Sequence, residues 1–168
     1  MAERKTIKPS KTRLISEMVI FSALSGIGAM MPIPSPVGSI ALDSCPGYFM
    51  ALWRGLPSGA LVCAIGHVLS SFRAGFPLGY IHIAVMFLMA LVGAVTALLN
   101  KKLGVVAGLA GGVALNTAGV VLAVPTYGWG IIPVLTPILF AASAVNAALA
   151  GMVFTAINKG LKRETVKG

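Results

Sequence analysis

Charged residues are scarce in this sequence, since Asp, Glu, Lys and Arg together make up only 10% of its 168 residues. A soluble domain of this size needs roughly a quarter of its residues charged to coat its surface. That coat is missing here, and hydrophobic residues make up 57% of the chain. The composition therefore excludes an ordinary soluble domain and indicates a protein solvated by lipid. Since a helical span takes about 20 residues, the length allows six spans and leaves no room for an added nucleotide-binding domain.

Acidic residues are the rarest charged type, and the chain holds only four: Glu3, Glu17, Asp43 and Glu164. The first and last lie in the terminal tails, and the other two are expected on opposite sides of the membrane. Paired carboxylates for acid–base catalysis are therefore not expected. The sequence also has no phosphate-binding glycine loop, no zinc-type histidine spacing and no nucleophile motif. We expect a protein that is not an enzyme and that carries no cofactor and no metal.

Basic residues give the chain a net charge of +9, and they gather in a few short segments. If the N-terminus lies inside the cell, twelve of the 13 Lys and Arg residues fall on the cytoplasmic side, and only Arg73 falls outside. This asymmetry predicts that both termini are cytoplasmic, where the basic tails can contact anionic lipid of the bilayer. Nucleic-acid binding is disfavoured, because no basic face is interleaved with aromatic residues.

Apolar runs separated by proline, glycine and basic residues predict an all-α integral membrane bundle with six transmembrane helices. The expected helices cover residues 12–31, 46–54, 58–72, 80–100, 105–124 and 133–158. The second of these helices is too short to cross a membrane by itself. We treat residues 1–168 as one domain, with basic cytoplasmic tails at 1–11 and 159–168.

The segment 32–45, between the first two helices, cannot be helical. Pro32, Pro34 and Pro36 remove backbone donors and exclude helical geometry. A bare loop in lipid would leave its backbone groups unpaired. We therefore expect this segment to cap the outer face of the bundle or to line a cavity.

A sparse set of polar and aromatic residues is predicted in the outer half of the bundle. Such polar groups should face the interior or a cavity rather than lipid. A pocket with apolar and aromatic walls and a few hydrogen-bonding groups suits a small organic ligand. The candidate ligand-binding residues are Asp43, Tyr48, His67, Phe72, Tyr80, His82, Asn116 and Asn146.

Structural roles compete with ligand binding for several of these residues. Asn116 and Asn146 can bond each other across the last two helices. His67 can be a packing histidine, and Asp43 can cap the second helix. The sequence leaves these alternatives open.

Small residues form a second pattern, on the first helix. Ser22 with Gly26, and Ser25 with Ala29, are pairs spaced by four residues. They make a smooth face on which another helix can pack closely, either within the bundle or on a partner protein.

The whole layout resembles the substrate-binding S components of energy-coupling factor (ECF) vitamin transporters. The similarity lies in the basic N-terminus, the small-residue face of the first helix, the long outer loop, the short second helix and the six helices in a short chain. The segment from Pro34 to Tyr48, followed by Trp53-Arg54-Gly55, is most similar to the S components assigned to cobalamin precursors, particularly alpha-ribazole.

This resemblance implies a substrate-binding subunit in the cell membrane that takes a vitamin-like molecule at the outer face. Its partners would be a transmembrane coupling protein, which would dock on Ser22, Ser25, Gly26 and Ala29, and two ATPase subunits. The loop 32–45 would close over the ligand. An aromatic residue such as Tyr48, Phe72 or Tyr80 would stack on the flat base of alpha-ribazole, and Asp43, His82, Asn116 or Asn146 would bond its ribose.

Three alternatives remain open beside that interpretation. The chain can be an S component for another vitamin, such as cobalamin, riboflavin, thiamine or a queuosine precursor. It can be a self-sufficient small oligomeric membrane transporter. It can also be a structural membrane subunit without a ligand.

Overall fold

The computed structural model describes the backbone of residues 10–167 and the side chains of residues 10–160. Regular structure in this part of the chain is helical: α1 (Lys11–Ala29), α2 (Cys45–Trp53), α3 (Leu56–Ala74), α4 (Ile81–Leu103), α5 (Val105–Ala118), the 3-10 helix η1 (Gly119–Ala123), α6 (Val124–Tyr127) and α7 (Ile131–Lys167). The predicted all-α class is confirmed.

Four helical segments are long and apolar enough to cross a membrane within the described residues: Lys11–Ala29, Ile81–Leu103, Val105–Tyr127 and Ile131–Gly160. The third of these combines α5, η1 and α6. The short α2 has nine residues. Several apolar helices are thus compatible with a multi-pass membrane protein, whereas six separate spans and the side on which the termini lie stay predictions.

The helix boundaries differ from the expected ones mainly at the ends of α3 and α7. α3 continues through Ala74 because Gly75, with φ of 75°, provides the left-handed cap that stops it. α7 continues to Lys167, so the segment expected as a C-terminal tail is helical as far as that residue. The expected tail at residues 1–11 lies outside the described residues except for its last two.

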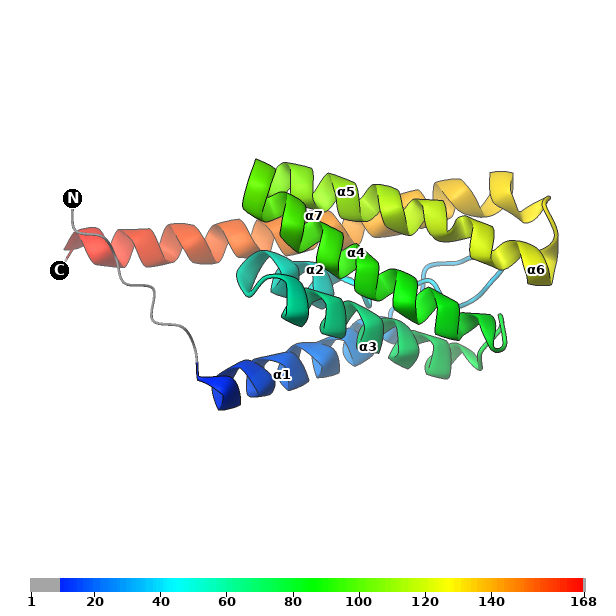
Figure 1. Cartoon of the computed structure of the whole chain (residues 1–168), viewed down its shortest axis with the longest axis horizontal. Coiled ribbons are helices and arrows are strands. Elements are labelled where there is room, and N and C mark those ends of the chain that lie inside the picture. The colour runs from blue at the N-terminus through cyan, green and yellow to red at the C-terminus, as the bar shows by residue number, and fades with distance from the viewer. Residues whose placement is uncertain (1–9, 168) are drawn as a thin grey trace.

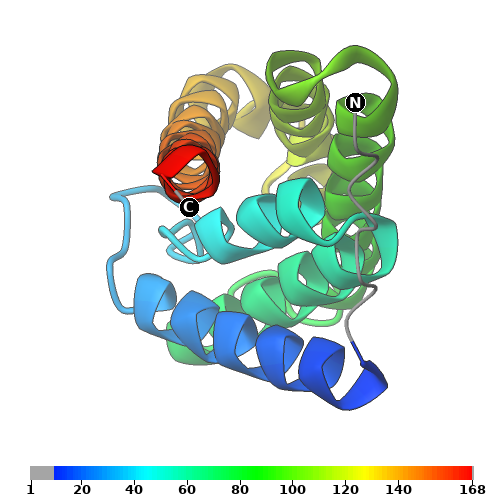
Figure 2. The same ribbon diagram turned by 90° about the vertical axis from the view of Figure 1, so that its left-hand side faces the viewer.

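The short helix α2 lies at the centre of the bundle, surrounded by α1, α3, α4 and α7 (Figures 1 and 2). Its side chains explain this position, because Tyr48 and Met50 are completely buried. α1 begins and α7 ends at the same end of the molecule, and the α2–α3 and α4–α5 turns lie there too (Figure 1). The chain segments that follow α1, α3 and α6 lie towards the opposite end.

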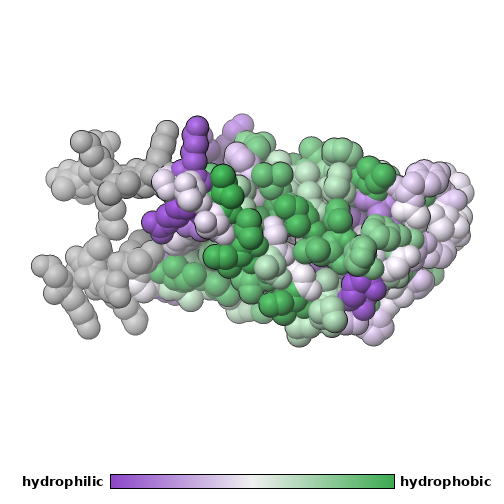
Figure 3. All heavy atoms as spheres, turned by 90° about the horizontal axis from the view of Figure 1, so that it is seen from below, coloured by the Kyte–Doolittle hydropathy of each residue, from purple (hydrophilic) through white to green (hydrophobic). Residues whose placement is uncertain are grey.

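Large apolar side chains cover much of the outer surface. Val106 is 82% exposed, and Val19 and Phe87 are also largely exposed. On the face seen in Figure 3, a broad hydrophobic region covers the middle of the molecule, and more polar residues gather at its two ends. A surface of this kind is stable in the hydrocarbon core of a bilayer, where apolar side chains need no water.

The small residues of α1 face the inside of the bundle. Ser25 and Ala29 are fully buried, and Ser22 is buried too. α1 packs against α3, and Ser25 faces Gly66, where an added Cβ would lie 3.0 Å from the Cβ of Ser25. Ser22, Ser25 and Ala29 are thus buried within this chain, and docking of a partner on this face stays a prediction. Gly26 is half-buried and faces Leu69 of α3.

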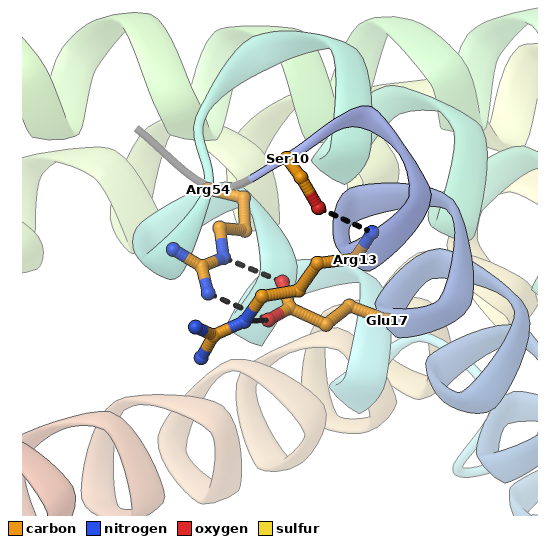
Figure 4. A network of polar contacts seen from close by, with 4 residues as sticks. All are labelled: Ser10, Arg13, Glu17 and Arg54. Atoms are coloured by element: carbon orange, nitrogen blue, oxygen red, sulfur yellow. Dashed lines mark hydrogen bonds and ion pairs between the residues drawn. The ribbon is translucent and has the colours of Figure 1, made fainter. Parts of the chain in front are cut away.

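An ion-pair cluster joins α1 to the C-terminal end of α2 (Figure 4). Nε and Nη2 of Arg54 each donate to one carboxylate oxygen of Glu17, both at 2.6 Å. Arg13 adds a third bond at 3.0 Å, and the Arg54 guanidinium lies over the Trp53 ring. Two-pronged bonds of this type hold both partners in one geometry. Glu17 thus fastens α1 to the central helix.

Candidate ligand-binding cavity

The loop between α1 and α2 is a folded strap. Ile33 N–H donates to Ile40 C=O at 2.9 Å, and Leu42 N–H donates to Met31 C=O at 3.3 Å. The turn at its tip needs a positive φ of 66°, which Gly38 adopts without strain. The prolines therefore exclude a helix, but backbone hydrogen bonds across the strap still hold it in one conformation.

Helix α3 holds the outer part of this strap. Ser70 Oγ donates to Ser39 C=O, and Arg73 Nη2 donates to Gly38 C=O, both at 2.9 Å. Further along, Gly66 lets the strap approach closely, because an added Cβ would lie 2.9 Å from the carbonyl oxygen of Asp43. The tip of the strap and its backbone at Asp43 are thus both set against one helix.

Helix α7 holds the inner part of the strap through Asn146. Its amide oxygen accepts from Cys45 N–H at 2.8 Å, and its amide nitrogen donates to Ala41 C=O at 3.1 Å and to Ala142 C=O at 2.9 Å. Every bond of this buried amide is made to backbone. Among the described residues no bond joins it to Asn116, so the expected pairing of the two amides across the helices is not what the structure has.

A cavity lies beneath the strap. It contains about 80 Å³ of space open to water-sized molecules. One water needs only about 10–15 Å³ by this measure, so the space holds a small organic group. Its apolar wall comes from α4, η1 and α7 and includes Val85, Leu88, Met89, Val120, Leu135 and Leu139.

Asp43 contributes a carboxyl group to the wall of this cavity. The residue is 5% exposed, and the Ser44 hydroxyl donates to its Oδ1 at 3.3 Å. Burial raises the pKa of Asp43 to about 7, because the charged form loses its hydration. Ser44, not Asp43, takes the N-cap position of α2, and no side-chain capping bond is formed there.

His67 lines the cavity from α3 and is joined to a buried polar cluster outside it. Its Nε2 lies 3.2 Å from Nδ1 of His82 and 3.1 Å from the Ser71 hydroxyl. The Ser71 hydroxyl is also 2.8 Å from His82 Nδ1. On the far side of that ring, Leu78 N–H donates to His82 Nε2 at 3.2 Å. His82 therefore supports His67 and does not itself line the cavity.

Asn116 lines the cavity from α5, and no hydrogen bond to its side chain is found among the described residues. Its amide is therefore available to a ligand, unlike that of Asn146. Ser143 also lines the cavity, but its hydroxyl lies 2.8 Å from the Tyr48 hydroxyl. Asp43, His67 and Asn116 are thus the expected residues whose polar groups keep unused bonding capacity in the cavity wall.

The three aromatic residues expected to stack on a ligand lie elsewhere. Tyr48 is fully buried in the core beside the cavity, whereas Phe72 and Tyr80 point outward and are 75% and 83% exposed. This corrects the expectation of an aromatic wall. Among the described residues, the His67 ring is the aromatic surface that reaches the cavity, and the rest of the apolar wall is aliphatic.

Sequence reasoning missed Ser39, Ser44 and Ser143, which also line the cavity. Ser143 precedes Asn146 by three residues, so one face of α7 carries both, and that spacing was a usable signal. Ser39 and Ser44 gave no such signal, because their positions depend on how the strap folds.

The arrangement fits the binding of a small molecule. Apolar side chains surround a few hydrogen-bonding groups, which is the pattern of small-molecule sites. Among the described residues, no group of three or more His, Cys, Asp or Glu side chains is placed to hold a metal ion. Comparison with protein-family models, with curated proteins and with solved structures finds no match to this chain, so the interpretation rests on the cavity itself.

Proposed function

We propose that this chain is the substrate-binding S component of an ECF-type importer in the cell membrane, and that it captures alpha-ribazole at the outer face. The observation that carries the proposal is the strapped cavity: an apolar space beneath a loop held by α3 and α7, with Asp43, His67 and Asn116 in its wall. A subunit that only supports an assembly needs no such space.

The cavity chemistry favours an uncharged molecule with one flat apolar part and one hydroxylated part. The dimethylbenzimidazole of alpha-ribazole would pack between aliphatic side chains such as Val120 and Leu139. The ribose hydroxyls would pair with Asp43 and Asn116, whose side chains can both donate and accept when Asp43 is protonated. Aliphatic packing thus replaces the aromatic stacking expected from the sequence.

Transport in this proposal depends on partners. The chain would pass its ligand inward in a complex with a transmembrane coupling protein and two ATPases, which would supply the energy. Cytoplasmic termini would place the ion-pair end of the bundle inside and the strapped cavity outside, where a scavenged nutrient arrives.

The test is isothermal titration of the purified protein with alpha-ribazole, riboflavin and thiamine, together with mass spectrometry of any ligand retained through purification. We expect heat with alpha-ribazole and none with the other two. Tight binding of riboflavin or thiamine instead would keep the S-component proposal and overturn the ligand. Absence of any retained or titrated ligand would overturn both.

Vesicles that contain this chain alone separate the proposal from a self-sufficient transporter. We expect the vesicles to bind labelled alpha-ribazole without accumulating it. Accumulation without a coupling protein or ATP would contradict the proposed dependence on partners.

A further inference from the structure

The hydrogen bonds around the buried pair His67 and His82 determine which ring nitrogen of each histidine carries the proton. Nε2 of His82 accepts a hydrogen bond from Leu78 N–H at 3.2 Å, so this nitrogen carries no proton. A neutral imidazole has one N–H group, and a cationic ring would direct a second N–H at the Leu78 donor. The proton of His82 is therefore on Nδ1.

This assignment determines the neighbouring ring as well. His82 Nδ1 lies 3.2 Å from His67 Nε2, and two N–H groups that face each other at this distance would repel. The Ser71 hydroxyl, 3.1 Å from His67 Nε2, donates to the His67 carbonyl oxygen at 2.8 Å and accepts from His82. His67 Nε2 is therefore an acceptor, and the proton of His67 is on Nδ1.

That Nδ1–H group has no hydrogen-bond partner among the described residues. His67 is 9% exposed and lines the cavity, and its Nδ1 is not among the fully buried polar atoms that lack a partner, so this nitrogen keeps accessible surface that a ligand can reach. A ligand that brings an acceptor to this point would give the donor a partner.

We infer that His67 Nδ1–H is a specificity-determining donor, which selects a ligand with a neutral acceptor at this position: an unprotonated ring nitrogen or a carbonyl oxygen of a flat heterocycle. His82 and Ser71 are positioning residues that hold His67 in the donating form. This inference rests on the proposed function for the presence of a ligand, and it adds which atom of the ligand is recognised. A ligand with an N–H group at this point would face a donor and be rejected.

The proton positions are tested without any ligand. The chain has only two histidines, so 15N-histidine labelling of the full chain, purified with a tag free of histidine, gives two ring systems. His67→Phe assigns them by removing one. We expect both rings in the Nδ1–H form, each with an unprotonated Nε2. An Nε2–H form of His67 would overturn the inference.

Recognition is tested with two matched nucleosides: alpha-ribazole and its indole analogue, in which C–H replaces the unprotonated ring nitrogen. We expect the wild type to bind the analogue about tenfold more weakly, the effect of one lost hydrogen bond. His67→Asn, which puts an amide nitrogen near the Nδ1 position, should keep most of this preference. His67→Gln, which reaches the Nε2 position instead, and His67→Phe should lose it.

The positioning roles have their own readout. His82→Phe should shift His67 towards a mixture of its two N–H forms and reduce the tenfold preference, even where the variant stays folded and binds. A His67→Phe variant that discriminates as strongly as the wild type would overturn the inference. If neither nucleoside binds the wild type, the proposed ligand fails, and the ring spectrum alone decides the proton assignment.

Discussion

The two ends of the central helix α2 are held by different chemistry. At the C-terminal end, Arg54 and Glu17 form a two-pronged ion pair in which each carboxylate oxygen has a partner. At the N-terminal end, a neutral amide, Asn146, bonds the backbone of the strap, and the Ser44 hydroxyl donates to the nearby Asp43 carboxyl. One end is closed and charged, and the other is neutral and hollow.

This difference separates anchoring from binding. Both carboxylate oxygens of Glu17 are bonded to Arg54 at the end of α2, and one of them also accepts from Arg13 on α1. At the cavity end, Asp43, His67 and Asn116 keep unused hydrogen-bonding capacity. Buried polar groups normally have a partner, so a ligand in the cavity would explain these three residues. Substitutions at the two ends should therefore have different effects. At the charged end they should lower stability alone, and at the hollow end they should lower stability, ligand binding or both.

The largest expected effect is at the amide that holds the strap. Asn146→Leu leaves Cys45 N–H and Ala41 C=O without their partner in a closed space, each costing about 1–3 kcal/mol. We expect the free energy of unfolding to fall by about 4 kcal/mol, measured by thermal and denaturant unfolding in detergent, and ligand binding to be lost.

Asn116→Leu is the matched control. It makes the same chemical change at a cavity residue whose amide has no bond among the described residues. We expect near-wild-type stability with weakened ligand binding. Equal destabilisation by the two variants would mean that Asn146 is not the residue that holds the strap.

The second expected effect is a pH dependence that comes from the hollow end. The pKa of Asp43 is about 7 in the folded chain and 3.8 ordinarily, so the folded state binds this proton more tightly. Its contribution to stability is complete below the ordinary pKa and is lost as pH rises through the folded one. Between about pH 4 and pH 7 the loss is on the order of 3 kcal/mol.

The Asp43→Asn variant isolates this contribution. It keeps the shape of the side chain and removes the titration, so subtracting its unfolding profile from that of the wild type cancels the other acids. We expect the difference to slope downward with rising pH across this window. A flat difference would show that the strap leaves Asp43 hydrated.

The third expected effect is at the charged end. Glu17→Gln removes the negative charge that neutralises Arg54, whose side chain is only 17% exposed. The cost lies between that of a surface pair and a buried one, about 2 kcal/mol. Arg13→Ala, on a side chain that is 67% exposed, is the control and should cost about 0.5 kcal/mol. Ligand affinity should be unchanged in both, and a loss of binding in Glu17→Gln would couple the two ends.

Most of the fold was predictable because it depends on local pattern. Apolar runs, prolines and glycines placed the starts of the expected helices within two residues of the observed ones, and Gly75 ends α3 as a left-handed cap does. The central place of α2 was not predictable, because it depends on which neighbours bury Tyr48 and Met50. The small residues of α1 fit either packing within the bundle or a partner, and the sequence did not show that α3 packs against them.

The site was predictable in its polar members and not in its walls. Asp43, His67 and Asn116 stood out because polar residues in an apolar chain need a reason to be there. The rest of the cavity wall comes from the folded strap and from η1. No pattern in the sequence indicated that these segments line a cavity. Side-chain direction was the other missing information: Phe72 lies near the end of α3 and Tyr80 at the start of α4, as expected, but both side chains are exposed and do not line the cavity.

The smallest expected effect comes from substituting the two exposed aromatic residues, Phe72 and Tyr80. Phe72→Ala and Tyr80→Ala change exposed side chains, and surface substitutions shift free energies by about 0.5 kcal/mol or less. Affinity for alpha-ribazole in titration should therefore stay within about twofold of the wild type. A tenfold loss in either variant would require the ring to turn inward when ligand binds. The strap would then move when ligand binds, and the binding site would include the surface beside the strap as well as the cavity beneath it.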